Sequence, residues 1–339
     1  LAKKLTRGLS GFVNAILRSV IREQDSIGIE DLAANDIEAI SFIYNIPLWL
    51  INLWISEFGR DKTEDLCAWF NEQPKLTARI NTILIDIPQC LTMLNDQGWA
   101  VTQDSNYEDI IYINNHRGSL EKSEAFIKGY ITFMDKASML VARLVNPQPG
   151  ERILDCCAAP GGKSMYMATL MDNVGSLMSC DIHEHKIELM NSNADRLGAS
   201  IVHTKVQDAT KLPDSWNSYF DRVLVDAQCS GLGILQKKLD MRWRKQESIL
   251  RELPPLQLAI LERAAMTVKE KGYLIYSTCT LNYKENEEVV ESFLQKHKEF
   301  SIIPVADDFP LKSNSGMITT YPPTDDMDGF FMVKMQRIS

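Results

Sequence analysis

The sequence lacks the patterns of a metal-bound or disulfide-stapled protein. Its 7 cysteines form no C-x-x-C pair, and its 5 histidines do not fall near them at zinc-ligand spacing. An odd count without a regular framework argues against a secreted disulfide scaffold. The missing ligand pairs argue against a structural metal. We therefore expect no metal and free thiols in a reducing, cytoplasmic environment.

Long apolar runs and signal-peptide features are also missing. The most apolar stretch, residues 40–55, is interrupted by Asn45, Pro47 and Asn52. It is shorter than the roughly 20 apolar residues that cross a bilayer. We expect a buried helix from Pro47 to Gly59 and no membrane partner.

Basic residues are outnumbered by acids, and the formal net charge of −9 argues by itself against a nucleic-acid partner. The charge is uneven, however, because two segments are rich in basic residues. The first contains Lys3, Lys4, Arg7, Arg18 and Arg22, and the second contains Lys237, Lys238, Arg242, Arg244, Lys245 and Arg251. Each run is either a solvated face or a surface for RNA.

Periodicity divides the chain into three parts. Residues 1–60 have helical spacing, and residues 61–145 contain short β-rich runs at 78–87 and 109–113. Strands and helices alternate over residues 146–339. We expect strands at 152–156, 176–181, 201–205, 220–226, 272–277, 301–305 and 330–334, and helices ending near 171 and 197 and spanning 256–270 and 284–297. This alternation predicts an α/β fold with a parallel sheet covered on both faces.

A turn of small residues and glycines follows the first of these strands, from Asp155 to Ser164. Such a turn lets the backbone approach a ligand closely, although an ordinary tight turn has a similar sequence. The turn lacks the G-x-G-x-x-G pattern of dinucleotide loops. Cys157 also stands where a Walker A loop needs glycine, so no phosphate cradle is indicated.

Two acids follow the next two expected strands. Asp181 is placed to accept hydrogen bonds from ribose hydroxyls, and Asp208 could accept from an adenine amino group. Each acid alone could be a helix cap or a surface residue. Together with the turn they predict a pocket for adenosine without phosphates, which is typical of S-adenosylmethionine (SAM).

Two cysteines lie just past the fourth and fifth expected strands. Cys229 follows Asp226, and Cys279 ends the run Tyr276-Ser277-Thr278. A single cysteine beside a strand is usually a small core residue. A pair beside an acid and a SAM pocket suits methylation of cytosine carbon 5, because a thiolate added to carbon 6 makes carbon 5 nucleophilic. A second thiol can assist release of the product.

Several segments resemble one enzyme family. Cys157-Ala158-Ala159-Pro160-Gly161-Gly162-Lys163, Asp226-Ala227-Gln228-Cys229-Ser230-Gly231 and Ser277-Thr278-Cys279 resemble the C-A-A-P-G-G-K, D-A-P-C-S-G and T-C motifs of RNA cytosine-C5 methyltransferases. Nearly the whole chain is similar to this family, most closely to the bacterial ribosomal RNA enzymes of the RsmB (Sun) type.

The resemblance implies a role for each motif residue. Cys279 is the nucleophile, Cys229 assists release, and Asp226 lies against the target base and the SAM methyl group. Lys163 supports Asp226, although it could be a plain helix-start lysine. The matching residues Asp181 and Asp208 are the ribose and adenine acids. The implied substrate is small-subunit (16S) ribosomal RNA, and we expect a monomer.

The resemblance also implies a domain plan. Residues 1–60 are a helical remnant of a NusB-like RNA-binding domain with a connector, most of that domain being absent. Residues 61–145 are a small α+β RNA-binding module in which Arg79 and Asn81 belong to an R-x-N-T strand. Residues 146–339 are a Rossmann-like SAM-dependent catalytic domain.

The chain departs from the family pattern at two positions. Gln228 replaces the proline before the second cysteine, and because proline fixes φ, its loss could loosen the loop and misplace Cys229. Met134 stands where the family usually has glutamine.

The basic loop after Cys229 is a candidate RNA contact. Arginine and lysine around an aromatic residue suit phosphate contacts and base stacking, and the candidates are Lys237, Lys238, Arg242 and Trp243. Alternatively, the loop is a basic surface with Trp243 tucked into the core.

Two other functions are compatible with the sequence. The chain could be a SAM enzyme acting on another RNA, on DNA or on protein. DNA enzymes place their nucleophile after the fourth strand, so Cys279 after the fifth favours RNA. Gln228 leaves room for the second alternative, a non-catalytic RNA-binding or ribosome-assembly protein.

Overall fold

The computed structural model describes residues 8–23, 37–116 and 118–338, which form two compact units, Leu1–Cys67 and Ala68–Ser339. The basic residues Lys3, Lys4 and Arg7 lie outside the described residues. The first unit contains α2 (Ser10–Glu23), α3 (Ile37–Tyr44) and α4 (Leu48–Phe58), and α5 (Arg60–Asn71) continues into the second unit. The helical character expected for residues 1–60 is thus found wherever that segment is described.

The helix expected from Pro47 is α4. Pro47 precedes its first turn, and Gly59 ends it with a positive φ of 82°. Leu50, Ile51 and Trp54 are its buried residues. No single helix within the described ranges is long and apolar enough to cross a membrane. The pair α3 and α4 passes the same test of length and composition together, but is bent by 116° at its break.

The second unit begins with a small antiparallel sheet of order β2-β3-β1-β4. Its elements are β1 (Thr77–Ile80), α6 (Ile87–Asp96), β2 (Ala100–Gln103), β3 (Ile110–Asn115), η2 (Leu120–Lys122), α7 (Glu124–Ile127) and β4 (Ile131–Phe133). The strand expected at residues 78–87 is shorter, because β1 ends at Ile80 and a turn follows, in which Leu84 N donates to Asn81 O at 3.1 Å. Asp86 then caps α6, accepting a hydrogen bond from Gln89 N at 2.8 Å, so the rest of the expected strand is a turn and a helix start.

The large sheet carries the rest of the unit. Its strands are β5 (Arg152–Asp155), β6 (Ser176–Asp181), β7 (Val202–Val206), β8 (Phe220–Asp226), β9 (Val268–Thr278), β10 (Phe300–Ile302), β11 (Met317–Thr319) and β12 (Phe331–Arg337). The order is β10-β12-β9-β8-β5-β6-β7, with β11 beside β12. β9, β8, β5, β6 and β7 are parallel, as expected, so the Rossmann-like α/β fold is confirmed.

The sheet is mixed rather than wholly parallel, which corrects the expectation. β12 pairs antiparallel with β9, and β10 and β11 pair antiparallel with β12. β11 reaches β12 without the long helical crossover that a parallel pair requires. The C-terminal strands therefore extend one edge of the sheet in the opposite direction.

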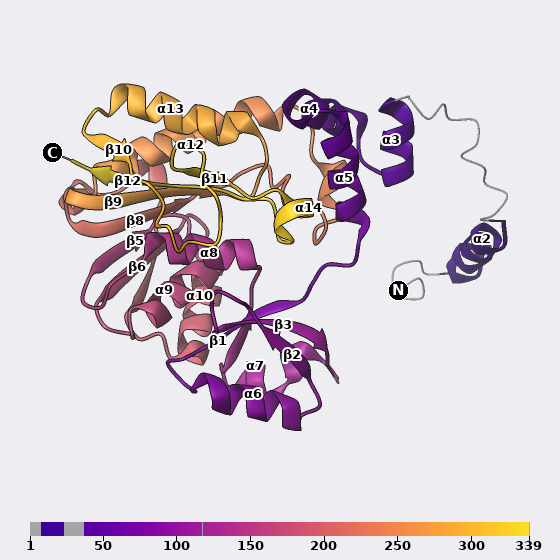
Figure 1. The fold of residues 1–339 in the computed structure, drawn as a ribbon, viewed down its shortest axis with the longest axis horizontal. Helices are drawn as coiled ribbons and strands as arrows, with labels where there is room; N and C mark the ends of the chain where they lie inside the picture. The colour runs from indigo at the N-terminus through magenta and orange to yellow at the C-terminus, as the bar shows by residue number, and fades with distance from the viewer. Residues whose placement is uncertain (1–7, 24–36, 117, 339) are drawn as a thin grey trace. The chain divides into compact units, whose positions relative to one another are not determined.

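Helices cover both faces of the sheet (Figure 1). The helices are α8 (Lys136–Val145), α9 (Gly162–Leu170), α10 (Glu184–Leu197), α11 (Met241–Arg244), α12 (Ile249–Ala265), α13 (Glu287–Lys296) and α14 (Pro322–Asp325), with short 3-10 turns η3 (Ala209–Lys211), η4 (Asp214–Trp216) and η5 (Tyr283–Glu285). α12 and α13 pack on one face of the sheet, and α8 and α9 pack on the other. The central strands are therefore buried on both sides, as their apolar sequences require.

The expected helix at residues 256–270 is displaced toward the N-terminus. α12 starts at Ile249 and contains Pro254 and Pro255, and its last residues give way to β9 at Val268. Proline usually marks a helix boundary because it lacks an N–H donor. Here Leu250, Leu253 and Gln257 are buried on one face across the two prolines. Burial of that face therefore outweighs the low helix propensity of the two prolines.

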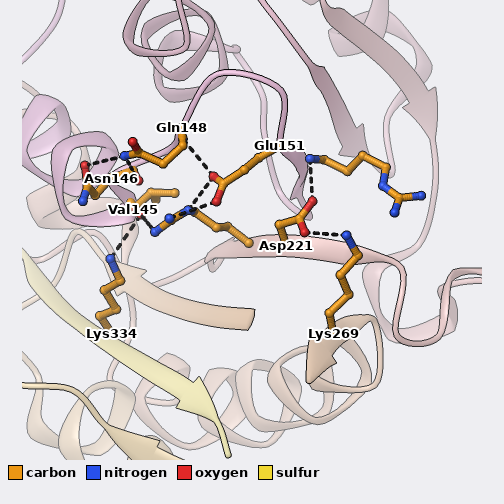
Figure 2. Close-up of polar contacts among 9 residues, drawn as sticks. Val145, Asn146, Gln148, Glu151, Asp221, Lys269 and Lys334 are labelled. Atoms are coloured by element: carbon orange, nitrogen blue, oxygen red, sulfur yellow. Dashed lines mark hydrogen bonds and ion pairs between the residues drawn. The ribbon is translucent and has the colours of Figure 1, made fainter. Parts of the chain in front are cut away.

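The amino ends of the central strands are held by ion pairs. Arg222, at the start of β8, makes two hydrogen bonds to the Glu151 carboxylate and donates to Val145 O at 2.8 Å. Asp221 pairs with Lys269, at the start of β9 (Figure 2). These charges tie the segments that enter β5, β8 and β9. They lie at the strand ends opposite those that point toward the predicted site.

Asp155, at the carboxyl end of β5, gives a testable pH dependence. Burial raises the pKa of Asp155 to about 7 from 3.8, against the hydrogen bond from Ser164. The folded state therefore holds a proton that the unfolded state releases between about pH 4 and pH 7. Over that range we expect this group to lower the free energy of unfolding by up to about 1.4 kcal/mol per pH unit, with no further loss above pH 7.

Urea unfolding of wild type and Asp155→Asn between about pH 5 and pH 8 measures this slope. The variant should lack the contribution. Asp172→Asn, at an exposed position with φ 53° that asparagine tolerates, is the matched control. Equal slopes for wild type and Asp155→Asn would contradict the assignment.

A close approach of two glycines joins the C-terminal segment to the loop after β8. Gly233 N donates to Cys279 O at 3.0 Å, and Gly329 N donates to Gly233 O at 2.8 Å. A Cβ at Gly233 would lie 1.8 Å from Gly329 O. We expect Gly233→Ala to destabilise the protein by about 1–3 kcal/mol through overpacking.

Thermal unfolding measures this effect. Gly11→Ala is the control, because no atom of the described residues lies within 4 Å of a Cβ at that helical position. Equal melting temperatures for Gly233→Ala and wild type would show that the backbones can separate without cost.

Candidate active site

One cavity of about 520 Å³ opens at the carboxyl ends of the parallel strands. Seven of the residues singled out in the sequence line it: Cys157, Ala159, Asp181, Asp208, Asp226, Cys229 and Cys279. Ligands bind at this edge of open α/β sheets. The tertiary structure thus brings part of the glycine-rich turn, the three acids and both cysteines to a single cavity.

The glycine-rich turn joins β5 to α9. Gly161 adopts a φ of 97°, and a Cβ there would lie 3.2 Å from Met190 Cγ, so this position favours glycine. Ala158 N donates to Cys180 O at 2.8 Å, which ties the turn to the neighbouring strand β6. Ala158, Pro160, Gly161 and Gly162 therefore shape the turn, while Cys157 and Ala159 line the cavity.

The two acids lie where the strand order predicts, on neighbouring loops. Asp181, at the end of β6, accepts hydrogen bonds from His183 N at 3.0 Å and from Lys186 Nζ at 3.4 Å. Asp208 accepts from Thr210 N at 2.9 Å and from its hydroxyl at 2.7 Å, and these bonds lower the pKa of Asp208. Asp208 is therefore also the cap of η3, and both acids line the cavity.

The remaining lining suits an adenosine group without phosphates. Ile182, Ala209 and Ile260 supply apolar surface near the two carboxylates, and Lys186 is already paired with Asp181. No group of three or more metal-ligating side chains occurs among the residues that the structure describes. The donor set, with carboxylates for ribose and apolar walls for a purine, fits SAM.

Asp226 is held on both carboxylate oxygens. Lys163 Nζ lies 2.6 Å from Oδ2, and Ser277 Oγ donates to Oδ1 at 2.7 Å. Burial works against the charge of Lys163, but Asp226 and other nearby acidic groups raise its pKa overall. The Lys163 ammonium also lies 5.3 Å from the centre of the Phe330 ring. Lys163 is thus a buried partner of Asp226 and not a plain helix-start lysine.

The two cysteines are in direct contact. Their Sγ atoms are 3.2 Å apart, and Cys279 N donates to Cys229 Sγ at 3.3 Å. The hydrogen bond with Cys279 and then burial raise the pKa of Cys229 well above its usual range. Cys229 is therefore a protonated thiol at neutral pH. The replacement of proline by Gln228 has not moved Cys229 away from Cys279.

The structure corrects the RNA assignment of Arg79 and Asn81. Both side chains are fully buried. Arg79 donates to Thr169 Oγ1 at 3.1 Å, and Asn81 donates to Gly129 O at 3.0 Å and Leu197 O at 2.8 Å. These contacts link the small sheet to α9 and α10. Burial thus places both residues in packing between segments, away from the surface.

The basic loop after Cys229 divides into two groups. Lys237 pairs with Asp135 and Asp328, and Arg242, only 3% exposed, donates to Asn71 Oδ1 at 2.7 Å. Both cations therefore hold protein segments together. Burial corrects the assignment of Arg242 to RNA, whereas Lys237 is exposed and its assignment stays a prediction. Lys238 and Trp243 are also exposed, Trp243 by 60%. The alternative of Trp243 tucked into the core is wrong.

Two further polar side chains support residues of the site from outside the cavity lining. Ser277 supports Asp226, and the fully buried Glu285 contacts the loop that carries Cys229. Ser277 stands within a motif, but the sequence assigned it no role. Glu285 stands in the run Lys284-Glu285-Asn286-Glu287-Glu288, which is typical of a solvated helix start. No local signal distinguishes the buried acid from its neighbours.

Comparisons with known proteins agree with this geometry. The model of the family "16S rRNA methyltransferase RsmB/F" matches residues 142–336, and the model "Methyltr_RsmF/B-like, ferredoxin-like domain" matches residues 46–118. The three-part division at residues 60 and 145 stays a prediction.

Individual relatives cover nearly the whole chain. The "Probable ribosomal RNA small subunit methyltransferase B" of Bacillus subtilis (strain 168) is 36% identical, over 98% of this chain and 74% of its own length. The crystal structure of PH0851 has a TM-score of 0.87 and 28% identity, over 98% of this chain and 74% of that one. NSun6 from Pyrococcus horikoshii, solved with SFG, has a TM-score of 0.78 and 21% identity, over 85% of this chain and 97% of that one.

The fold, the cavity at the strand ends and the similarity to known relatives therefore indicate the same family. The chain belongs to the 16S rRNA methyltransferase RsmB/F family and is a SAM-dependent rRNA methyltransferase.

Proposed function

We propose that the enzyme methylates carbon 5 of a cytosine in 16S rRNA through a covalent bond between Cys279 and carbon 6 of the base. The observation that carries the proposal is the 3.2 Å contact between the Cys229 and Cys279 sulfurs in the cavity that Asp181 and Asp208 also line. Two thiols beside an acid suit addition to and elimination from a pyrimidine ring.

The chain's own residues carry the addition. Cys279 gives up its thiol proton to solvent, its Sγ forms a bond to carbon 6, and the electron pair of the carbon 5–carbon 6 double bond shifts so that carbon 5 becomes a nucleophile. SAM, when bound, supplies the electrophilic methyl group. Asp226 can hydrogen-bond the N3 edge of the base and stabilise the adduct. Lys163 and Ser277 orient this carboxylate, one on each oxygen.

Release reverses the addition. The bond between carbon 5 and its proton breaks, the carbon 5–carbon 6 double bond re-forms, and the bond from sulfur to carbon 6 breaks. The Cys229 thiol, 3.2 Å from Cys279 Sγ, passes its own proton to the departing sulfur and takes up the carbon 5 proton in its place. The atoms balance without another reactant.

We infer that RNA approaches through the exposed part of the basic loop, at Lys238 and Trp243. Trp243 can stack on a base, and Lys238 can contact a phosphate. The target base must leave its stack to reach Cys279. We also propose that the enzyme is a monomer and acts in the cytoplasm.

Substitutions of the two cysteines should block different steps of the reaction. Cys279→Ala should lower methyl transfer from labelled SAM to 16S rRNA by at least about 10³-fold, because no adduct forms. Cys229→Ala should form the adduct and accumulate it, because release lacks its thiol. Denaturing gels of the protein with RNA detect the adduct, and bisulfite sequencing locates the modified cytosine.

Matched DNA is the control substrate. Transfer to DNA alone, or wild-type turnover by Cys279→Ala, would exclude the proposed mechanism. Normal SAM affinity of the wild type without turnover on any ribosomal RNA would favour the non-catalytic alternative.

Lys163 should affect turnover more than cofactor affinity. Lys163→Met removes the partner of Asp226 and should lower kcat by about 10²-fold. The SAM dissociation constant should stay within about twofold, since Lys163 does not line the cavity. Steady-state kinetics and calorimetry measure the two quantities.

Lys211→Met is the matched control, because its side chain is 80% exposed beside Asp208. A large loss of SAM affinity in Lys163→Met, with kcat preserved, would place this lysine in cofactor binding instead.

A further inference from the structure

A buried carboxylate lies behind the two cysteines. Glu285 ends the short helix η5, which follows Cys279, and it is fully buried. It belongs to neither the cavity lining nor the motifs of the sequence. A buried charge costs free energy unless neighbouring groups compensate it. The groups that surround Glu285 therefore show which segments it holds in place.

Hydrogen-bond donors from three segments converge on Glu285. Ser230 donates its N–H at 2.8 Å and also its hydroxyl, from the loop after β8. Gln257 Nε2 donates at 3.0 Å from α12, and Asn282 Nδ2 donates at 3.0 Å from the loop after β9. The carboxylate therefore joins the two loops that carry the cysteines to the helix that covers them.

No lysine or arginine pairs with Glu285 among the ion pairs of the described residues. Neutral donors compensate its charge. If one donor moved away, a buried acceptor would be left unsatisfied and the protein would lose stability. A neutral apolar residue would fill the same space without that risk. The geometry thus fixes the donor positions closely, above all that of Ser230.

Residues on both sides of Cys229 are held by this cluster. Ser230 follows Cys229 and binds Glu285 directly. Gln228 precedes it, and the Gln228 carbonyl accepts from the same Gln257 amide at 2.9 Å. This hydrogen bond uses the backbone carbonyl of residue 228, so it forms without proline at that position. The cluster therefore supplies the restraint that the absent proline would otherwise give.

The charge of Glu285 also acts on Cys229. It adds to the hydrogen bond with Cys279 and to burial in raising the pKa of Cys229. A Cys229 that keeps its proton is the form that can pass a proton to the departing sulfur.

We propose that Glu285 is a positioning residue for product release, acting through Cys229 by fixing residues 228–230 against Cys279. The inference rests on the proposed function, because it uses the release role of Cys229. Glu285 touches neither RNA nor SAM in this role. Its loss should impair release selectively, leaving adduct formation and SAM binding in place.

Single-turnover reactions of the full chain with SAM and 16S rRNA test this. Glu285→Gln keeps the size of the side chain but removes its charge and replaces one acceptor oxygen by a donor. We expect adduct formation and the SAM dissociation constant within about twofold of wild type, and adduct decay slowed at least about tenfold. Combining Glu285→Gln with Cys229→Ala should slow decay no further than Cys229→Ala alone, because both act on one step.

Glu287→Gln is the matched control. It lies two residues further along, is partly buried, and interacts with Thr319 rather than with a cysteine loop. Its adduct should decay as in wild type. If Glu285→Gln does not fold, Ser230→Ala removes one donor and keeps the carboxylate. It should slow decay in the same direction.

The outcomes separate the two proposals. Wild-type decay in Glu285→Gln or Ser230→Ala, with adduct trapped by Cys229→Ala, overturns the role of Glu285 and leaves the proposed function standing. Equal losses of SAM affinity and adduct formation in Glu285→Gln would show a general structural role and also overturn it. No trapped adduct in Cys229→Ala overturns the release mechanism and this inference with it.

Discussion

The pairing of β8 with β9 is the constraint on which the site depends. In the parallel register Asp226 lies opposite Ser277, so the acid and the hydroxyl that orients it end neighbouring strands. Cys279 follows two residues later and meets Cys229 from the loop after β8. A slip of one residue would turn these side chains to the other face of the sheet. The Arg222 and Asp221 ion pairs, at the other ends of the same strands, help to hold this register.

Buried polar groups complete the positioning of the site residues, which the strand register begins. Lys163 compensates the charge of Asp226, whereas the donors to Glu285 from the described part of the chain are neutral. The two acids therefore suit different tasks. Asp226 lines the cavity, where a nucleobase can reach it. Glu285 is buried behind the cavity and fixes the backbone on both sides of Cys229. A restraint of this kind explains how Cys229 stays in contact with Cys279 although Gln228 stands in place of proline.

Cations that resemble RNA contacts in sequence serve packing when they are buried or when acids of other segments pair with them. Arg79 lies against the Tyr166 ring at 5.1 Å, and burial lowers its pKa to about 10. Lys237 lies between Asp135 and Asp328, and Arg242 binds the end of α5. The acids that neutralise the loop come from distant segments. The surface left for RNA on this loop is accordingly narrower than its composition indicates.

The sequence by itself determined the alternating strands and helices, the adenosine-type pocket and the Cys–Asp–Cys set, because each depends on local order: an apolar strand followed at once by a polar residue. It could not determine that β12 runs antiparallel, that α12 continues through Pro254 and Pro255, or that Arg79 is buried. Only the tertiary structure decided these points, and with them the place of Glu285. Burial and hydrogen-bond partners there come from segments far apart in the chain, and no local pattern encodes which of them will meet.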